Sequence, residues 1–128
     1  MIRWALLAAG LSGTLAVALG AFAAHALRES LAPDMRAVLD TAGHYHFVHT
    51  LAVLAAALAP AAGAARRPLA LACGAWLFGI VVFSGSLYAL AVTGIGWLGA
   101  LTPIGGVAFL LGWGLFVRAA WKARPAPR

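Results

Sequence analysis

The chain has 128 residues, of which 64% are hydrophobic and only 9% are charged, and its mean hydropathy is +0.97. A chain this short and apolar leaves no room for a soluble catalytic module, so we expect a single transmembrane domain covering residues 1–128. The net charge of +6 is scattered along the chain rather than gathered in one basic patch, which argues against a nucleic-acid partner.

Four apolar stretches fill most of the sequence, and the charged residues lie in the gaps between them. A helix of about 20 apolar residues, rising ~1.5 Å per residue, crosses the ~30 Å hydrocarbon layer of a lipid bilayer. The pattern predicts an all-α fold, an integral membrane four-helix bundle. The predicted spans are residues 4–27, 46–65, 68–93 and 97–118.

Small residues predict where these spans pack closely. In the first span they recur every fourth residue, which leaves one side of the helix smooth enough for a neighbouring helix to approach. We expect the same role for three glycines in the third and fourth spans. The predicted packing residues are Ala16, Gly20, Ala24, Gly85, Gly105 and Gly106.

Residues 31–42, between the first two spans, predict a short amphipathic helix lying on the outer membrane surface. Pro33 suits the first turn of a helix, and Arg36 and Asp40 are one turn apart. An ordinary polar loop is the alternative interpretation.

The later connections are short. The basic turn at residues 63–68 makes the second and third spans antiparallel neighbours. In the last connection, Thr102 has the character of a helix N-cap and Pro103 that of a first helical residue. The fourth helix is therefore expected to begin near Pro103.

The distribution of charge predicts the orientation in the membrane. Seven cations fall on one side of the predicted bundle, whereas the other side holds two arginines offset by three carboxylates. The positive-inside rule then places both termini in the cytoplasm, or in the matrix of an organelle. The seven cations are Arg3, Arg66, Arg67, Arg118, Lys122, Arg124 and Arg128.

Polar side chains gather in the outer half of the predicted bundle and come from all four spans. Because a polar group in hydrocarbon costs free energy unless it is paired, we expect these side chains to face one another inside the bundle. Such a cluster is also the natural candidate for a site. Its predicted members are His25, Tyr45, His46, His49, Thr50, Ser84, Ser86, Tyr88 and Thr102.

Two or three imidazoles in this cluster can ligate a transition metal or haem. Histidines near span ends also tie helices together. We favour that structural role, and predict no metal site, because the cluster has no carboxylate, no cysteine and no known ligand spacing. The sequence thus identifies no cofactor.

Enzyme chemistry is poorly supported. The three carboxylates, Glu29, Asp34 and Asp40, all belong to the connection after the first span, so no acid and base pair can form within the membrane. A serine and histidine dyad would lack an orienting carboxylate, and no nucleophile elbow surrounds Ser84 or Ser86. We expect a protein that is not an enzyme.

Several segments resemble the signature segments of the domain-of-unknown-function 423 (DUF423) family of small four-span membrane proteins. They are residues 20–25, Tyr45 with residues 49–52, residues 83–88, and residues 102–106 through Gly112 and Trp113. The resemblance covers essentially the whole chain. It implies a bacterial inner-membrane protein and no known activity.

Two positions depart from the family pattern. Ala23 stands where the resemblance implies glycine, and His46 stands where it implies glutamine, which leaves His25 and His49 as the better ligand candidates. We expect a non-enzymatic accessory or assembly partner that binds a larger membrane complex, lipid or a second copy of itself. The alternative is binding or transfer of a quinone, haem, metal ion or proton at the polar cluster.

Overall fold

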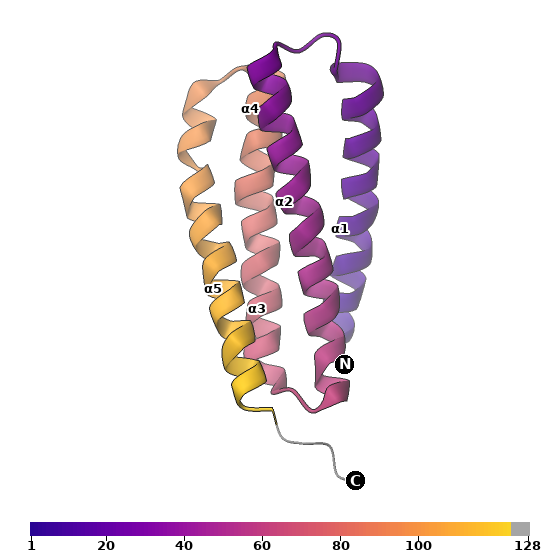
Figure 1. The fold of residues 1–128 in the computed structure, drawn as a ribbon, viewed down its shortest axis with the longest axis vertical. Helices are drawn as coiled ribbons and strands as arrows, with labels where there is room; N and C mark the ends of the chain where they lie inside the picture. Colours follow the sequence, from indigo (N-terminus) through magenta and orange to yellow (C-terminus); the bar gives the residue numbers. More distant parts are fainter. Residues whose placement is uncertain (124–128) are drawn as a thin grey trace.

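The computed structural model describes residues 1–123, which are helical almost throughout (Figure 1). This part of the chain contains four helices long and apolar enough to cross a membrane, which confirms the predicted all-α membrane fold. Each long helix combines an α-helix with a shorter turn of π- or 3-10-helix. The first long helix comprises α1 (Arg3–Phe22) and a π-turn (Ala23–Leu27), and the second comprises α2 (Pro33–Leu58) and a 3-10 turn (Ala59–Ala62). The third comprises α3 (Arg66–Gly79), a π-turn (Ile80–Ser84) and α4 (Gly85–Thr93). The fourth comprises a 3-10 turn (Gly96–Ala100) and α5 (Thr102–Trp121).

The interfacial helix predicted for residues 31–42 is not a separate element, and this prediction is wrong. α2 begins at Pro33 and runs unbroken to Leu58. The predicted break would fall near Gly43 and would leave backbone N–H and C=O groups unpaired beside the membrane. Keeping a glycine inside a continuous helix costs only about 1 kcal/mol. His46 therefore lies more than three turns inside α2 rather than at its start.

The fourth helix starts near Pro103 as predicted, but without the predicted cap. α5 begins at Thr102 itself, and no side chain caps it. Thr102 is not the N-cap, because its hydroxyl instead lies 3.2 Å from Ser86 Oγ on α4. Pro103 does lie in the first turn, where its missing N–H leaves no helical hydrogen bond unmade.

The helices form a bundle in which α2 and the α3–α4 helix are central (Figure 1). α1 packs mainly against α2, and α5 packs mainly against α3. Figure 1 shows the N-terminus and the end of α5 at the same end of the bundle, close to the turn between α2 and α3. α1 is the most exposed helix, since only Ala5 and Ala9 are buried along its length.

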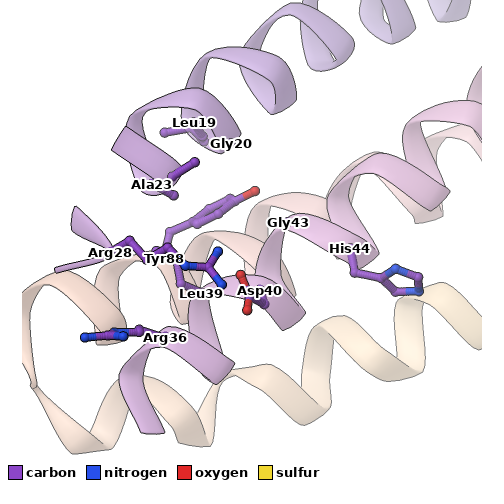
Figure 2. Close-up of a pocket in the computed structure, with 11 residues that line it drawn as sticks. Leu19, Gly20, Ala23, Arg28, Arg36, Leu39, Asp40, Gly43, His44 and Tyr88 are labelled. Atoms are coloured by element: carbon purple, nitrogen blue, oxygen red, sulfur yellow. The ribbon is translucent and has the colours of Figure 1, made fainter. Parts of the chain in front are cut away.

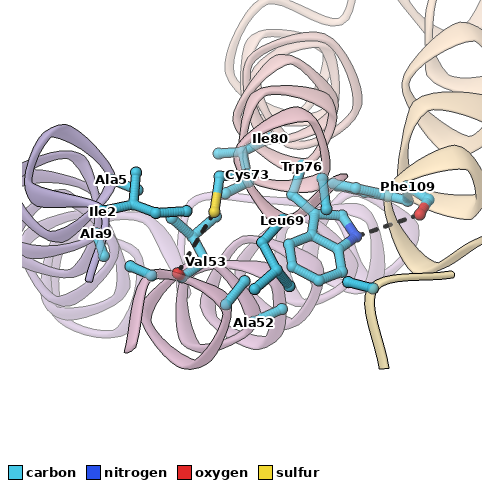
Figure 3. Close-up of a cluster of buried hydrophobic side chains, with 14 residues drawn as sticks. Ile2, Ala5, Ala9, Ala52, Val53, Leu69, Cys73, Trp76, Ile80 and Phe109 are labelled. Atoms are coloured by element: carbon cyan, nitrogen blue, oxygen red, sulfur yellow. Dashed lines mark hydrogen bonds between the residues drawn. The ribbon is translucent and has the colours of Figure 1, made fainter. Parts of the chain in front are cut away.

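The buried core joins the first residues of the chain to the second half of α2, to α3 and to α5 (Figure 3), and so lies toward the end of the bundle where the N-terminus is. Trp76 is its largest side chain and is fully buried, with its indole N–H donating to the Phe109 carbonyl at 3.3 Å. Its ring lies against Gly112, where a Cβ atom would overlap the indole. Small residues such as Ala56 and Ala72 fill the space around it, which lets the helix backbones approach closely.

The predicted packing residues fall in different environments. Gly105 is buried against the backbone of Phe83, leaving no room for a Cβ atom, and Gly106 faces the Phe83 ring. A Cβ atom on Gly85 would meet only the Ile80 carbonyl of the same long helix, and Ala16 is half-buried. The prediction is wrong for the end of the α1 stripe. Gly20 and Ala24 are exposed, and a Cβ atom on Gly20 would meet nothing within 4 Å.

Candidate functional site

His46 is the centre of a hydrogen-bonded network that joins three helices. Its Nδ1 lies 3.0 Å from the Tyr88 hydroxyl on α4, and its Nε2 lies 3.1 Å from Ser12 Oγ on α1. Ser12 Oγ also lies 2.6 Å from Thr50 Oγ1, one turn along α2. The network therefore connects α1, α2 and α4 near the middle of the bundle.

The geometry assigns the protons of this network. The Thr50 hydroxyl donates to the His46 carbonyl at 2.8 Å, so the Ser12 hydroxyl must donate to Thr50. Ser12 Oγ then accepts from the Nε2–H of His46. A neutral imidazole is left with a lone pair on Nδ1, which accepts from the Tyr88 hydroxyl. Every side-chain polar atom in the network has a partner, and a neutral His46 satisfies all of these contacts.

His49 forms a second group on the neighbouring side of α2. Its Nδ1 donates to the Tyr45 carbonyl at 2.8 Å, and its Nε2 accepts from the Trp113 indole N–H at 3.2 Å. Its ring stacks on Phe109 of α5, with a centroid distance of 3.6 Å and an interplanar angle of 8°. His49 is therefore also neutral, but with the proton on the opposite nitrogen from His46.

Two serines of the third helix behave differently. Ser86 Oγ donates to the Phe83 carbonyl at 2.9 Å, so it accepts from the Thr102 hydroxyl at 3.2 Å. Ser84 is fully buried, and its hydroxyl is the one buried side-chain polar atom without a hydrogen-bond partner in residues 1–123. It ends the π-turn of the third helix.

The predicted cluster is thus divided among separate groups, and His25 belongs to none of them. His25 is exposed and makes no hydrogen bond to a described residue. It lies within one turn of the end of the first helix, whereas His49 lies more than four turns into α2, so the two are separated along the bundle axis by roughly 20 Å. The expected meeting of His25 with His49 does not occur.

Three of the residues that complete these groups were not among the predicted site residues. Ser12 was missed because a serine next to a glycine is common in membrane helices and carries no spacing signal. Trp113 and Phe109 are one turn apart on α5, and both contact His49. Their spacing is the only sequence signal that they lie on the same face of the helix.

The arrangement offers little to a metal ion. Within the described residues no group of three or more His, Cys, Asp or Glu side chains is placed to hold one. The imidazole nitrogens of His46 and His49 that could ligate a metal already have hydrogen-bond partners. These groups are therefore suited to tying helices together.

Two open spaces lie beside the polar groups. A groove of about 460 Å³ between α2 and α5 is lined by aromatic rings, including those of Tyr45, Phe83 and Trp113. A smaller pocket of about 180 Å³ lies between α1 and α2 (Figure 2). Figure 2 shows the Tyr88 ring extending into that space, with Arg28 and Asp40 also lining it.

Comparison with known proteins gives a family and relatives without an assigned activity. The family model described as a protein of unknown function (DUF423) matches residues 19–106. The chain is 43% identical to a UPF0382 membrane protein of Haemophilus influenzae, covering 89% of this chain and 90% of the relative. It is 42% identical to the UPF0382 membrane protein YwdK of Bacillus subtilis, covering 88% and 91%.

A third relative is described by its location. The chain is 36% identical to the UPF0382 inner membrane protein YgdD of Escherichia coli K12, covering 95% of this chain and 92% of the relative. No solved structure matches the chain.

Proposed function

This chain belongs to the DUF423 family of proteins of unknown function, and from that premise we propose that it is a non-enzymatic accessory or assembly partner in the membrane. The protein is an integral membrane protein of unknown biochemical activity, with relatives in bacterial membranes. On this proposal it binds a larger membrane protein complex or lipid through its outer surface. Its interior holds the bundle together.

One observation carries the proposal: with the exception of the Ser84 hydroxyl, the buried polar side chains are hydrogen-bonded within the described chain. His46 and His49 each have both ring nitrogens in hydrogen bonds, to partners on other helices or on their own. A ligand site needs unpaired donors, acceptors or lone pairs that converge on a space. Here the ring nitrogens of both histidines already have partners within the chain, three of the four on another helix.

The outer surface, in contrast, is apolar and extensive. On α1, the side chains of Leu7 and Leu11 are 72% and 74% exposed, and on α5 Leu110 is 72% exposed. Such surfaces face lipid or a neighbouring membrane protein. The three carboxylate side chains of the chain lie between residues 29 and 40, and none of them is hydrogen-bonded to His46 or His49, which gives no support to acid–base catalysis.

The orientation is part of the proposal. The turn between α2 and α3 and both chain ends carry the seven cations noted above, so we place this end in the cytoplasm. In a bacterium the membrane is then the inner membrane, which is where the E. coli relative is described.

The test is purification at native expression in a mild detergent, followed by identification of stoichiometric partners. Leu11→Trp and Leu110→Trp form a matched pair, because each adds bulk to an exposed apolar position on a different helix. We expect one variant to lose the partner and the other to retain it. Recovery of the wild-type chain as a lone monomer without bound lipid, or a protein partner that neither variant affects, would contradict the proposal.

A second candidate function is binding of a flat apolar ligand, such as a quinone or haem, in the groove between α2 and α5. The specific observation in its favour is the aromatic lining of this groove, where Tyr45 and Trp113 are 40% and 41% exposed. Absorption spectra and solvent extracts of the purified protein test it. A ligand retained by wild type and lost in Trp113→Ala would favour it, whereas an unaltered Trp113→Ala extract would remove it.

A further inference from the structure

A cleft opens at the end of the bundle where the N-terminus lies, between the start of α3 and the end of α5. Its volume is about 620 Å³. Figure 1 shows these two helix ends lying side by side there. The cleft is remote from the polar groups around His46 and His49, and none of their residues lines it.

Cations dominate the lining of this cleft. Two come from the beginning of α3 and two from the end of α5: Arg66, Arg67, Arg118 and Lys122. All four side chains are exposed, so they are free to turn toward a bound group. The three carboxylate side chains of the chain lie between residues 29 and 40, at the opposite end, and cannot neutralise these cations. An anion in the cleft would relieve their mutual repulsion.

The start of α3 adds to the positive field. The helix begins at Arg66 with no side-chain cap, so its first backbone N–H groups point toward the cleft end without a partner from a capping side chain. Pro68 in the same turn has no N–H to satisfy. The N-terminal end of α3 favours an anion, whereas the C-terminal end of α5 at the same cleft carries the opposite partial charge, so the preference for an anion rests on the four cationic side chains.

The cleft is also amphipathic. Below the cations it is lined by Leu71, which is 56% exposed, and by Leu115, which is half-buried. A soluble anion would gain nothing from these apolar side chains, whereas a phospholipid would place its phosphate among the cations and its acyl chains against the leucines. The combination of charge above and apolar surface below fits a lipid.

We propose that this cleft binds an anionic phospholipid with two phosphates, of the cardiolipin type. Within the described residues no carboxylate side chain lines the cleft, and its four cations exceed the single charge of one phosphodiester, whereas a headgroup with two phosphates offers one phosphate to the pair from each helix. This inference deepens the proposed function, because it names the lipid class and its site. A binding site of this kind retains the lipid at a defined stoichiometry. Cations that serve only to orient the protein in the membrane would not retain it.

Native mass spectrometry of the purified full chain in detergent tests the proposal. Cardiolipin, phosphatidylglycerol and phosphatidylcholine are added in turn, and we expect one cardiolipin per chain at concentrations where the other two are not retained. The double variant Arg66→Gln, Arg118→Gln removes two cations of the cleft, and Arg28→Gln, Arg36→Gln removes two cations at the other end of the bundle. Both lower the net charge from +6 to +4.

We expect the cleft variant to reduce the retained cardiolipin on the order of tenfold and the control variant to leave it unchanged. Equal loss in both variants, or loss in neither, would overturn the proposal. If the double variant does not fold, Lys122→Gln at the exposed end of α5 makes the same comparison with a smaller expected loss.

Excess sodium phosphate separates a lipid site from a site for free phosphate. Cardiolipin that stays bound in phosphate supports the lipid, whereas displacement by phosphate overturns it. The measurement uses the isolated chain, so failure to find a protein partner does not affect its outcome.

Discussion

The Nδ1 atom of His46 lies 3.0 Å from the hydroxyl of Tyr88, and this contact joins α2 to α4 across the middle of the bundle. It is one part of a continuous network in which each hydroxyl donates once and the imidazole stays neutral. A charged histidine at this depth would carry a desolvation cost that no carboxylate is present to offset. The network therefore lets a titratable residue serve as a neutral connector between helices.

Removing this connector should destabilise the bundle. His46→Ala leaves the Tyr88 hydroxyl without its partner and removes a bond to Ser12, so we expect a loss of about 2 kcal/mol in the free energy of unfolding. His46→Gln keeps one donor and one acceptor and should cost less than about 1 kcal/mol. Unfolding in mixed detergent, followed by tryptophan fluorescence, measures both. Equal stability of His46→Ala and wild type would contradict the network.

The two histidines first considered as ligands should respond differently to the same substitution. His49→Asn removes the stacking on Phe109 and the acceptor for Trp113, so we expect a loss of about 1–2 kcal/mol. His25→Asn changes an exposed residue and should alter stability by less than about 0.5 kcal/mol. The same unfolding measurement compares them. A larger effect at His25 would show that it has a structural partner after all.

The sequence predicted the number and type of the helices because hydropathy and length alone decide which segments can span a bilayer. It did not predict where α2 begins, because charges at Arg36 and Asp40 look the same on a surface helix and on the exposed end of a long one. That error led to the wrong site prediction. Because His46 was predicted to be the first residue of a span, His25 and His49 were predicted to lie at the same depth in the membrane.

The partners of the buried histidines were harder to predict for a different reason. Ser12 and Trp113 reach His46 and His49 only because α1 and α5 have particular rotations about their axes. Helix rotation depends on side-chain packing against neighbours, and α1 carries apolar residues on all sides. Hydropathy therefore contains no information about which face of α1 meets α2.

Glycines at helix contacts give a third prediction, with a matched control in the same helix. A Cβ atom at Gly105 would overlap the Phe83 backbone, which cannot move aside as a side chain can, so Gly105→Ala should cost about 1–3 kcal/mol. A Cβ atom at Gly114 would meet nothing within 4 Å, so Gly114→Ala should be neutral or stabilise α5 slightly. Thermal unfolding in detergent, monitored by circular dichroism, compares the two variants. Similar effects at both positions would refute the close α5 contact.

The proposed orientation can be tested with cysteines, because the chain has one native cysteine and it is buried. Cys73 is fully buried between helices, so wild type should not react with a maleimide in the folded state. Ser30→Cys and Ala62→Cys place exposed thiols at opposite ends of the bundle.

If the cation-rich end faces the cytoplasm, a membrane-impermeant maleimide that crosses the outer envelope should label Ser30→Cys in intact cells and Ala62→Cys only after the inner membrane is opened. Labelling in the reverse order would invert the orientation, and with it the leaflet from which the cleft beside Arg118 would draw its lipid. Labelling of both variants in intact cells would place both ends outside and so contradict the spanning topology itself. The wild-type chain, treated identically, is the control for exposure of Cys73.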